Sequence, residues 1–144
     1  MSTNHLAAYE LAETFFQALE ERNISLIEPH LADDVAEIIP FSNTGTIDPF
    51  YTFTGKAEVL GYLNTIVTNF SRVILNNKRY SVAAEGTSVF VQAEGDLVQT
   101  GTGTTYLNSY VFKFEIHDGQ MTHIDEYANP IAYALLAGLP IGVK

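Results

Sequence analysis

Two acidic residues occupy positions where a carboxyl group can transfer protons. Glu126 shares one face of an expected strand with Thr122 and Ile124, because alternate residues of a strand point the same way. A carboxyl group on a buried strand face loses hydration, which raises its pKa and lets it donate a proton near neutral pH. Asp48 precedes Pro49 in an aromatic loop, where it would close over a cavity mouth as a second acid or base. The alternatives are a glutamate satisfied by backbone amides or a tyrosine, and a plain Asp-Pro turn.

Two polar residues are candidates for holding a ligand. Asn108 and Tyr110 share a strand face with Phe112 and Phe114, so they would orient a carbonyl or hydroxyl group between apolar walls. Alternatively, they complete a buried hydrogen-bond network.

Histidines and acids gather near the C-terminal end, where they resemble a set of metal ligands. Alternation places His123 and Asp125 on one strand face and Glu126 on the other, while His117 and Asp118 belong to a turn. Metal ligands must converge, so we expect no metal site. The absence of cysteine excludes disulfides, thiolate catalysis and cysteine-held zinc or iron–sulfur clusters. We expect no cofactor.

The composition limits the class of partner. A chain of 144 residues is expected to form one domain, residues 1–144, with room for a core and a pocket. Its net charge of −10, from 7 basic and 17 acidic residues, argues against nucleic acid and anionic membranes as partners. No apolar run reaches the roughly 20 residues that span a bilayer, and no secretory signal is visible, so we expect a cytoplasmic protein.

Helices dominate the first half of the chain. The apolar stripe of Leu11, Phe15 and Leu19 predicts an amphipathic helix from Ser2 to Arg22. The further elements expected there are a short helix from Ser25 to Leu31 that Asp33-Asp34 closes, a strand from Val35 to Ile39, a loop from Pro40 to Thr54, and a third helix, capped by Thr54, that buries Val59, Leu63, Ile66 and Phe70.

Strands dominate the second half, where the apolar period changes to two from Lys78 onward. The strongest signal is a hairpin, in which Asp118-Gly119 turns the chain between a strand that begins near Tyr106 and a strand from Gln120 to Tyr127. Asn129-Pro130 then starts a short helix. This order predicts an α+β fold: a curved, cone-shaped antiparallel sheet with three N-terminal helices on its concave face and a short C-terminal helix.

Three segments of the sequence carry a family resemblance: LADDV at Leu31 to Val35, TGKAEVLGYL at Thr54 to Leu63, and FEIHDGQMTHIDEYANP at Phe114 to Pro130. With the order of elements, they resemble the SnoaL-like branch of the nuclear transport factor 2-like superfamily, whose fold is also called ketosteroid isomerase-like or cystatin-like. The resemblance covers nearly the whole chain. It implies a fold rather than one activity, because the superfamily includes isomerases, polyketide cyclases, epoxide hydrolases, dehydratases and plain binding modules.

The steroid isomerases of this superfamily lend themselves to a residue-by-residue comparison. Their oxyanion-binding tyrosine falls on Phe15, their general-base aspartate on Ile39, and their protonated aspartate on or near Phe112. None of these three side chains carries the functional group that the reaction needs, so steroid isomerisation by that mechanism is not expected.

The ending DEYANPIAYALLAG is more similar to the phenazine-biosynthesis A/B proteins, whose acidic pocket residue falls on Glu126. This resemblance implies that Glu126 faces into the cone, and that two copies pair through the outer face of the sheet. The expected pocket wall is Phe15, Ile39, Phe41, Phe112 and Ile124, with Asn108 and Tyr110 positioning the ligand.

Two functions from different classes fit these residues. The leading hypothesis is an enzyme that binds a small, largely apolar molecule and performs cofactor-independent isomerisation, cyclisation or dehydration, with Glu126 as proton donor or acceptor. The alternative is a non-catalytic ligand-binding or dimerisation module of the same fold. A Glu126 pKa near the usual value of about 4.3 favours the module, and a strongly raised pKa favours proton transfer.

Overall fold

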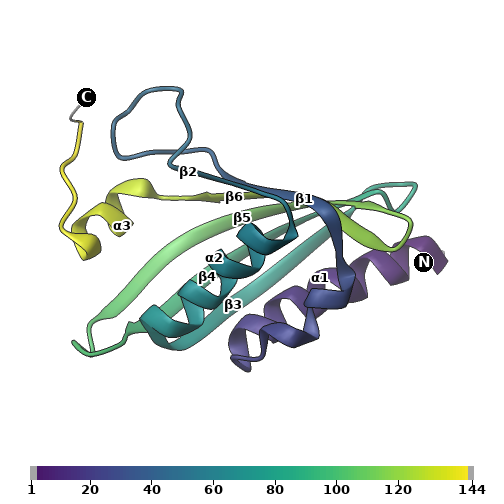
Figure 1. The fold of residues 1–144 in the computed structure, drawn as a ribbon, viewed down its shortest axis with the longest axis horizontal. Coiled ribbons are helices and arrows are strands. Elements are labelled where there is room, and N and C mark those ends of the chain that lie inside the picture. The colour runs from purple at the N-terminus through teal and green to yellow at the C-terminus, as the bar shows by residue number, and fades with distance from the viewer. Residues whose placement is uncertain (1–2, 143–144) are drawn as a thin grey trace.

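Six strands form one bent sheet in the order β2-β1-β6-β5-β4-β3 in the computed structural model, which describes residues 3–142 (Figure 1). Neighbouring strands are antiparallel, except that β1 and β6 run parallel. The α+β class with a curved sheet is therefore confirmed, and the sheet is mixed rather than purely antiparallel. The strands are β1 (Leu31–Ile39), β2 (Tyr51–Thr54), β3 (Phe70–Val82), β4 (Ser88–Gln99), β5 (Thr105–His117) and β6 (Gln120–Ala128).

Two long helices, α1 (Thr3–Glu20) and α2 (Lys56–Asn69), lie across the same face of the sheet (Figure 1). Ser2, where the first helix was expected to begin, lies outside the described residues. No described helix combines the length and apolar character that a bilayer crossing requires.

The expected second helix is wrong in kind, because only two 3-10 turns, Ile24–Leu26 and Glu28–His30, occupy its place. The segment is too short to repay helix nucleation, and Pro29 lacks the N–H that would continue it. Strand β1 starts directly afterwards, so Asp33 and Asp34 lie within the strand as exposed residues and end no helix.

Two boundaries around α2 also differ from the prediction. The predicted loop from Pro40 to Thr54 is wrong at its end, because Tyr51–Thr54 form strand β2. The N-cap position of α2 is occupied by Gly55, with φ +89°, and not by Thr54. Phe70, expected on the helix, begins β3 well before Lys78. Its aromatic ring is buried in either conformation, so apolar spacing alone could not separate the two.

The C-terminal hairpin and helix are confirmed. Asp118 (φ +50°) and Gly119 (φ +75°) both adopt the left-handed conformation that a tight hairpin turn requires. The Asn129 side chain accepts a hydrogen bond from the Ile131 amide at 3.0 Å and caps α3 (Pro130–Ala137). Strand β6 therefore runs directly into a short helix at one end of the sheet.

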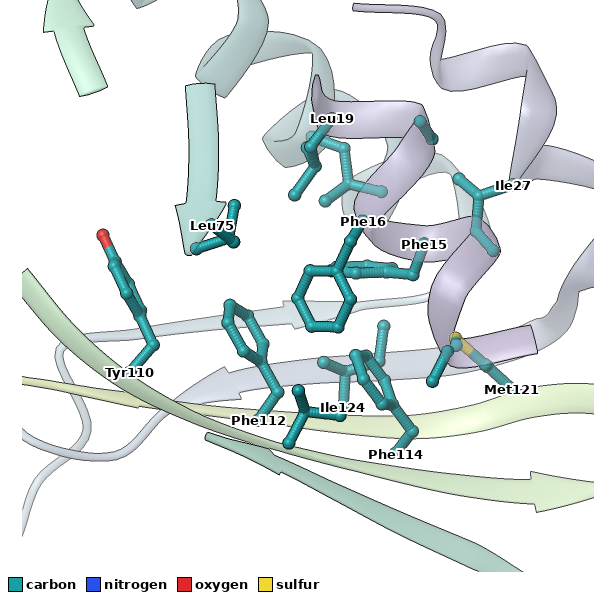
Figure 2. Close-up of a cluster of buried hydrophobic side chains, with 14 of the residues drawn as sticks. Phe15, Phe16, Leu19, Ile27, Leu75, Tyr110, Phe112, Phe114, Met121 and Ile124 are labelled. Atoms are coloured by element: carbon teal, nitrogen blue, oxygen red, sulfur yellow. The ribbon is translucent and has the colours of Figure 1, made fainter. Parts of the chain in front are cut away.

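Aromatic side chains fill the space between α1 and the sheet (Figure 2). Phe15 packs against Phe114 with ring centroids 4.9 Å apart, and Phe16 packs against Phe112 at 5.1 Å. All four rings are buried. These rings therefore fill the concave face beneath the middle of α1.

Candidate functional site

A cavity of about 120 Å³ lies on the concave face of the sheet, between α2, α3 and the segment that follows β1. Apolar and aromatic side chains make most of its wall, and Phe41 and Tyr51, which are 55% and 41% exposed, mark its open side. An apolar cavity of ~150 Å³ admits one benzene ring, so this one has room for about one ring without side-chain movement. The lining residues are Leu19, Ile39, Phe41, Phe50, Tyr51, Tyr62, Thr65, Ile66, Asn69, Phe70, Val73, Leu75, Leu97, Tyr106, Tyr110, Phe112, Glu126, Ala128, Asn129, Pro130 and Tyr133.

Glu126 is the acid in this wall. It points inward from β6 as predicted, and only 8% of its surface is exposed. The hydroxyl of Tyr62, on α2, donates to both carboxyl oxygens of Glu126 at 3.0 Å. Burial, then the charges of Glu126 and Glu37, raises the pKa of Tyr62 well above its usual value. Tyr62 therefore keeps its proton and acts as a permanent donor to Glu126.

A second acid, Glu37, lies behind Glu126 and is fully buried. In the parallel pairing of β1 with β6, Glu37 stands opposite Ile124, two residues before Glu126 on the same strand face. The charge of Glu126 is, after burial, the largest influence on the pKa of Glu37, so the two carboxyl groups are neighbours. No N–H or O–H group of the described chain donates to either Glu37 oxygen. Two carboxyl groups can share a hydrogen bond only when one of them is protonated.

The protonation of this pair follows from burial. Desolvation, and then the charges of Glu126 and Asp125, raises the pKa of Glu37 well above its usual value. Burial also raises the pKa of Glu126, whereas hydrogen bonds from Glu37 and Tyr62 lower it. Glu37 is thus the member that holds a proton more firmly, and Glu126 is the member that faces the cavity.

Sequence reasoning missed Glu37, although a signal for it exists. Val35, Glu37 and Ile39 alternate along the predicted strand and share its inner face. A charged residue between two apolar residues on one strand face indicates a buried acid. Tyr62 was also missed, since its role depends on a contact with a strand 64 residues away.

Tyrosine hydroxyls supply the other polar groups of the cavity. The Tyr106 oxygen accepts from the Asn108 amide at 2.6 Å. Burial raises the pKa of both Tyr106 and Tyr110, so both hydroxyls keep their protons. With a donor already on its oxygen, Tyr106 can direct its own hydrogen to a ligand.

Asn108 lies behind this wall. Its side chain bridges to Asn129 in both directions, donating to the Asn129 carbonyl and accepting from the Asn129 amide, each at 3.0 Å. It therefore fixes the junction of β6 and α3 and orients Tyr106, as the network alternative anticipated. The predicted direct contact with a ligand is not supported, because Asn108 does not line the cavity.

The predicted wall is correct in part. Phe15 and Ile124 are fully buried in the core and do not line the cavity, because Phe112 lies between them and Tyr110, which does line it (Figure 2). The predicted residues that do line it are Ile39, Phe41, Tyr110, Phe112 and Glu126.

Asp48 lies apart from Glu126. Its carboxyl oxygen accepts from the Thr46 hydroxyl at 3.3 Å, and its backbone amide donates to the Thr46 hydroxyl oxygen at 3.3 Å, within an exposed turn. It borders a shallow surface hollow and is absent from the cavity wall. The position of Asp48 therefore fits the alternative of a plain Asp-Pro turn. None of its contacts among the described residues couples it to Glu126.

Three possible metal ligands do converge, on the outer face of the sheet. His123 and Asp125 of β6 are joined by Glu115 of β5, and their ligand atoms lie within 4.8 Å of one another. The His123 ring nitrogen already contacts the Asp125 carboxyl at 2.9 Å. The prediction that possible metal ligands do not converge omitted Glu115, which comes from the neighbouring strand. Asp118 belongs to the turn, as expected, whereas His117 is the last residue of β5 and was wrongly assigned to the turn.

Comparison with known proteins places the chain in a family. The model of the SnoaL-like domain matches residues 12–124. The chain belongs to the SnoaL-like domain family. No curated protein matches it in sequence.

Solved structures of several proteins share the fold. A phenazine biosynthesis-related protein from Pseudomonas aeruginosa is 15% identical, with a TM-score of 0.76 over 98% of this chain and 91% of that one. A nuclear transport factor 2-like protein from Anabaena variabilis is 18% identical, with a TM-score of 0.71 over 89% and 91%. An LEH-like epoxide hydrolase from M. tuberculosis is 18% identical, with a TM-score of 0.68 over 96% and 89%. The SnoaL-like chain therefore has the nuclear transport factor 2-like fold.

Proposed function

We propose that this SnoaL-like protein binds a compact, largely apolar molecule with a carbonyl or hydroxyl group and transfers a proton within it without a cofactor. The observation that carries the proposal is the buried Glu126, which faces an aromatic cavity while Tyr62 holds both of its oxygens at 3.0 Å. A carboxyl group desolvated in this way has a pKa above its usual value, which suits acid/base work near neutral pH.

The arrangement suggests how the proton would move. The Glu126 carboxylate would take a proton from a carbon next to the ligand carbonyl, and the C–H electron pair would form an enolate. The enolate oxygen would accept a hydrogen bond from the Tyr106 hydroxyl. This donor would replace the two steroid-isomerase donors whose positions are Phe15 and Phe112 in this chain. In a ligand with a β,γ-double bond, Glu126 would then return the proton to the γ-carbon, and the double bond would move into conjugation. In a ligand with a β-hydroxyl group, Glu126 would give the proton to that oxygen as the C–O bond breaks, and water would leave. The first ending is an isomerisation, and the second is a dehydration.

Hydrogen exchange tests this proposal before the product is known. Small aromatic ketones with exchangeable α-hydrogens would be incubated with the protein in D₂O, and deuterium uptake followed by proton NMR. We expect uptake faster than in buffer, and its loss in Glu126→Gln. The matched control is Glu85→Gln, because Glu85 is exposed in the β3–β4 turn and absent from the cavity wall.

The outcome separates a catalyst from a binding module. Binding of these ketones, seen as a rise in melting temperature, with no deuterium uptake would favour the non-catalytic alternative. Equal uptake by wild type and Glu126→Gln would remove Glu126 from the mechanism.

We also propose that two copies of the chain pair through the outer face of the sheet. Phe90 of β4 and Leu107 of β5, which are 44% and 64% exposed, point away from the helices. Sedimentation equilibrium at micromolar concentration should give a dimer, and Leu107→Glu should weaken it. A monomeric wild type would contradict this proposal.

A further inference from the structure

We propose that Glu37 and Glu126 share one proton, with Glu37 as the protonated member and donor, so that Glu126 presents a hydrogen-bonded carboxylate to the cavity. This inference deepens the proposed function and rests on it for its purpose. It assigns a task to Glu37, which lies outside the cavity wall and acts through Glu126 as a positioning residue.

Within residues 3–142, the carboxyl group of Glu37 lacks any hydrogen-bond donor other than a shared proton. Glu37 is 0% exposed, and neither of its oxygens has a hydrogen-bond donor among the described residues. An ionised carboxylate in such a place would lose its hydration without compensation, at a cost that proteins avoid by neutralising the group. A protonated Glu37 instead donates its O–H to Glu126. Only hydrogen-bond acceptors of a neutral group then remain unsatisfied.

The sign of the surrounding charges also favours a protonated Glu37. The groups that act on Glu37 are Glu126 and Asp125 from β6, and Tyr62 stands opposite on α2 with its proton retained. Both charged neighbours are acids, so they oppose a negative charge on Glu37. Neighbouring carboxyl groups that interact strongly titrate as a pair, in which the second ionisation is much harder than the first.

The proton belongs to Glu37 rather than to Glu126 because the two carboxyl groups have different surroundings. Glu126 receives the Tyr62 hydroxyl on both oxygens and opens to the cavity, so its charged form is the better stabilised. Glu37 has neither advantage. The protonated carboxyl group, Glu37, therefore lies behind the cavity wall, and the carboxylate, Glu126, faces the cavity. Proton abstraction from a ligand requires this arrangement.

The dyad can be tested without any ligand. Glutamate labelled with carbon-13 at the side-chain carboxyl would be followed by NMR across a pH series, with Glu37→Gln and Glu126→Gln assigning the two signals. We expect the Glu37 signal to keep the protonated shift at pH 7, while exposed glutamates titrate near their usual values. In Glu126→Gln, the Glu37 signal should stay protonated. An ionised Glu37 at pH 7 in the wild type would overturn the proposal.

A pair of substitutions separates hydrogen bonding from packing. Glu37→Gln keeps an N–H donor toward Glu126, whereas Glu37→Met keeps the length of the side chain without a donor. The Glu126 titration midpoint should rise by about one pH unit or more in Glu37→Met and stay closer to wild type in Glu37→Gln. Equal midpoints in the two variants would refute a donor role for Glu37.

The NMR titration tests the shared proton, and the exchange assay tests the proposed function, so either proposal can fail without the other. If the protein takes up no deuterium from any ketone, the titration still decides whether the dyad exists. If Glu37 proves ionised while Glu126→Gln abolishes exchange, Glu126 works alone. The infrared C=O stretching band of a protonated carboxyl group checks the wild type directly, should either Glu37 variant fail to fold. The band should be present at pH 7, and its absence would overturn the proposal.

Discussion

The pH dependence of stability gives a direct measure of the buried Glu37. An acid whose pKa is raised in the folded state binds more protons there than in the unfolded chain, so its stabilising contribution is complete below the unfolded pKa. As pH rises above about 4.5, the usual value for this group, the unfolded chain ionises while folded Glu37 stays protonated. The free energy of unfolding of the wild type should therefore fall relative to Glu37→Gln.

The expected slope follows from linkage. Over the range in which only the unfolded chain has ionised, each pH unit costs the wild type up to about 1.4 kcal/mol relative to Glu37→Gln, whose side chain does not titrate. The fall begins near pH 5, and it levels off once Glu37 ionises in the folded protein. Acids that do not contact Glu37 titrate alike in both proteins, so their effect cancels in the difference. Glu126 keeps an N–H donor in Glu37→Gln, so its own contribution should change little.

Urea unfolding between pH 5 and 8 measures this difference, with circular dichroism as the signal because the chain has no tryptophan. Glu85→Gln is the matched control, since an exposed glutamate should give a nearly flat difference from wild type. A flat difference for Glu37→Gln would show that Glu37 ionises as easily in the folded protein as in the unfolded chain, and would refute the argument from burial.

Three further substitutions test the contacts around the cavity. Tyr62→Phe removes the donor to Glu126, so it should raise the Glu126 pKa by NMR titration and lower the free energy of unfolding by about 1.5–3 kcal/mol. Asn108→Ala should cost about 1–3 kcal/mol and speed amide hydrogen exchange in α3, because it frees the helix junction. Gly95→Ala places a Cβ against the Tyr110 ring, so it should push that ring into the cavity, weaken ketone binding in melting assays and cost about 1–3 kcal/mol. Unchanged unfolding curves would contradict each account.

The fold was largely predictable because its signals are local. The hairpin turn at Asp118-Gly119 and the Asn129 cap each depend on a few adjacent residues, and both are confirmed. The errors lie where tertiary pairing decides the structure. Strand β2 has few residues and exists because it pairs with β1, placing Phe53 opposite Glu37. The parallel pairing of β1 with β6 likewise leaves no trace in either segment alone.

The candidate site was predictable only from one side. Strand alternation gave the inward direction of Glu126, and the family resemblance gave its place in a cone. Glu37 and Tyr62 come to the same point from β1 and α2, and only the assembled sheet shows that they meet. Asn108 shows the opposite case, because its strand face was correct but its amide points to Asn129 rather than to a ligand.

The apolar residues at the steroid-isomerase positions help to explain where the polar groups lie. Phe15 and Phe112 pack together with ring centroids 5.9 Å apart, so neither of these positions offers a hydrogen-bond donor to a ligand. Tyr62 and Tyr106 bring hydroxyls to the opposite end, close enough that the charge of Glu126 raises the pKa of both. A ligand in this cavity would therefore meet a carboxyl group and a hydroxyl donor together near α2 and α3. Any chemistry at this site would thus be displaced from α1 toward the C-terminal helix.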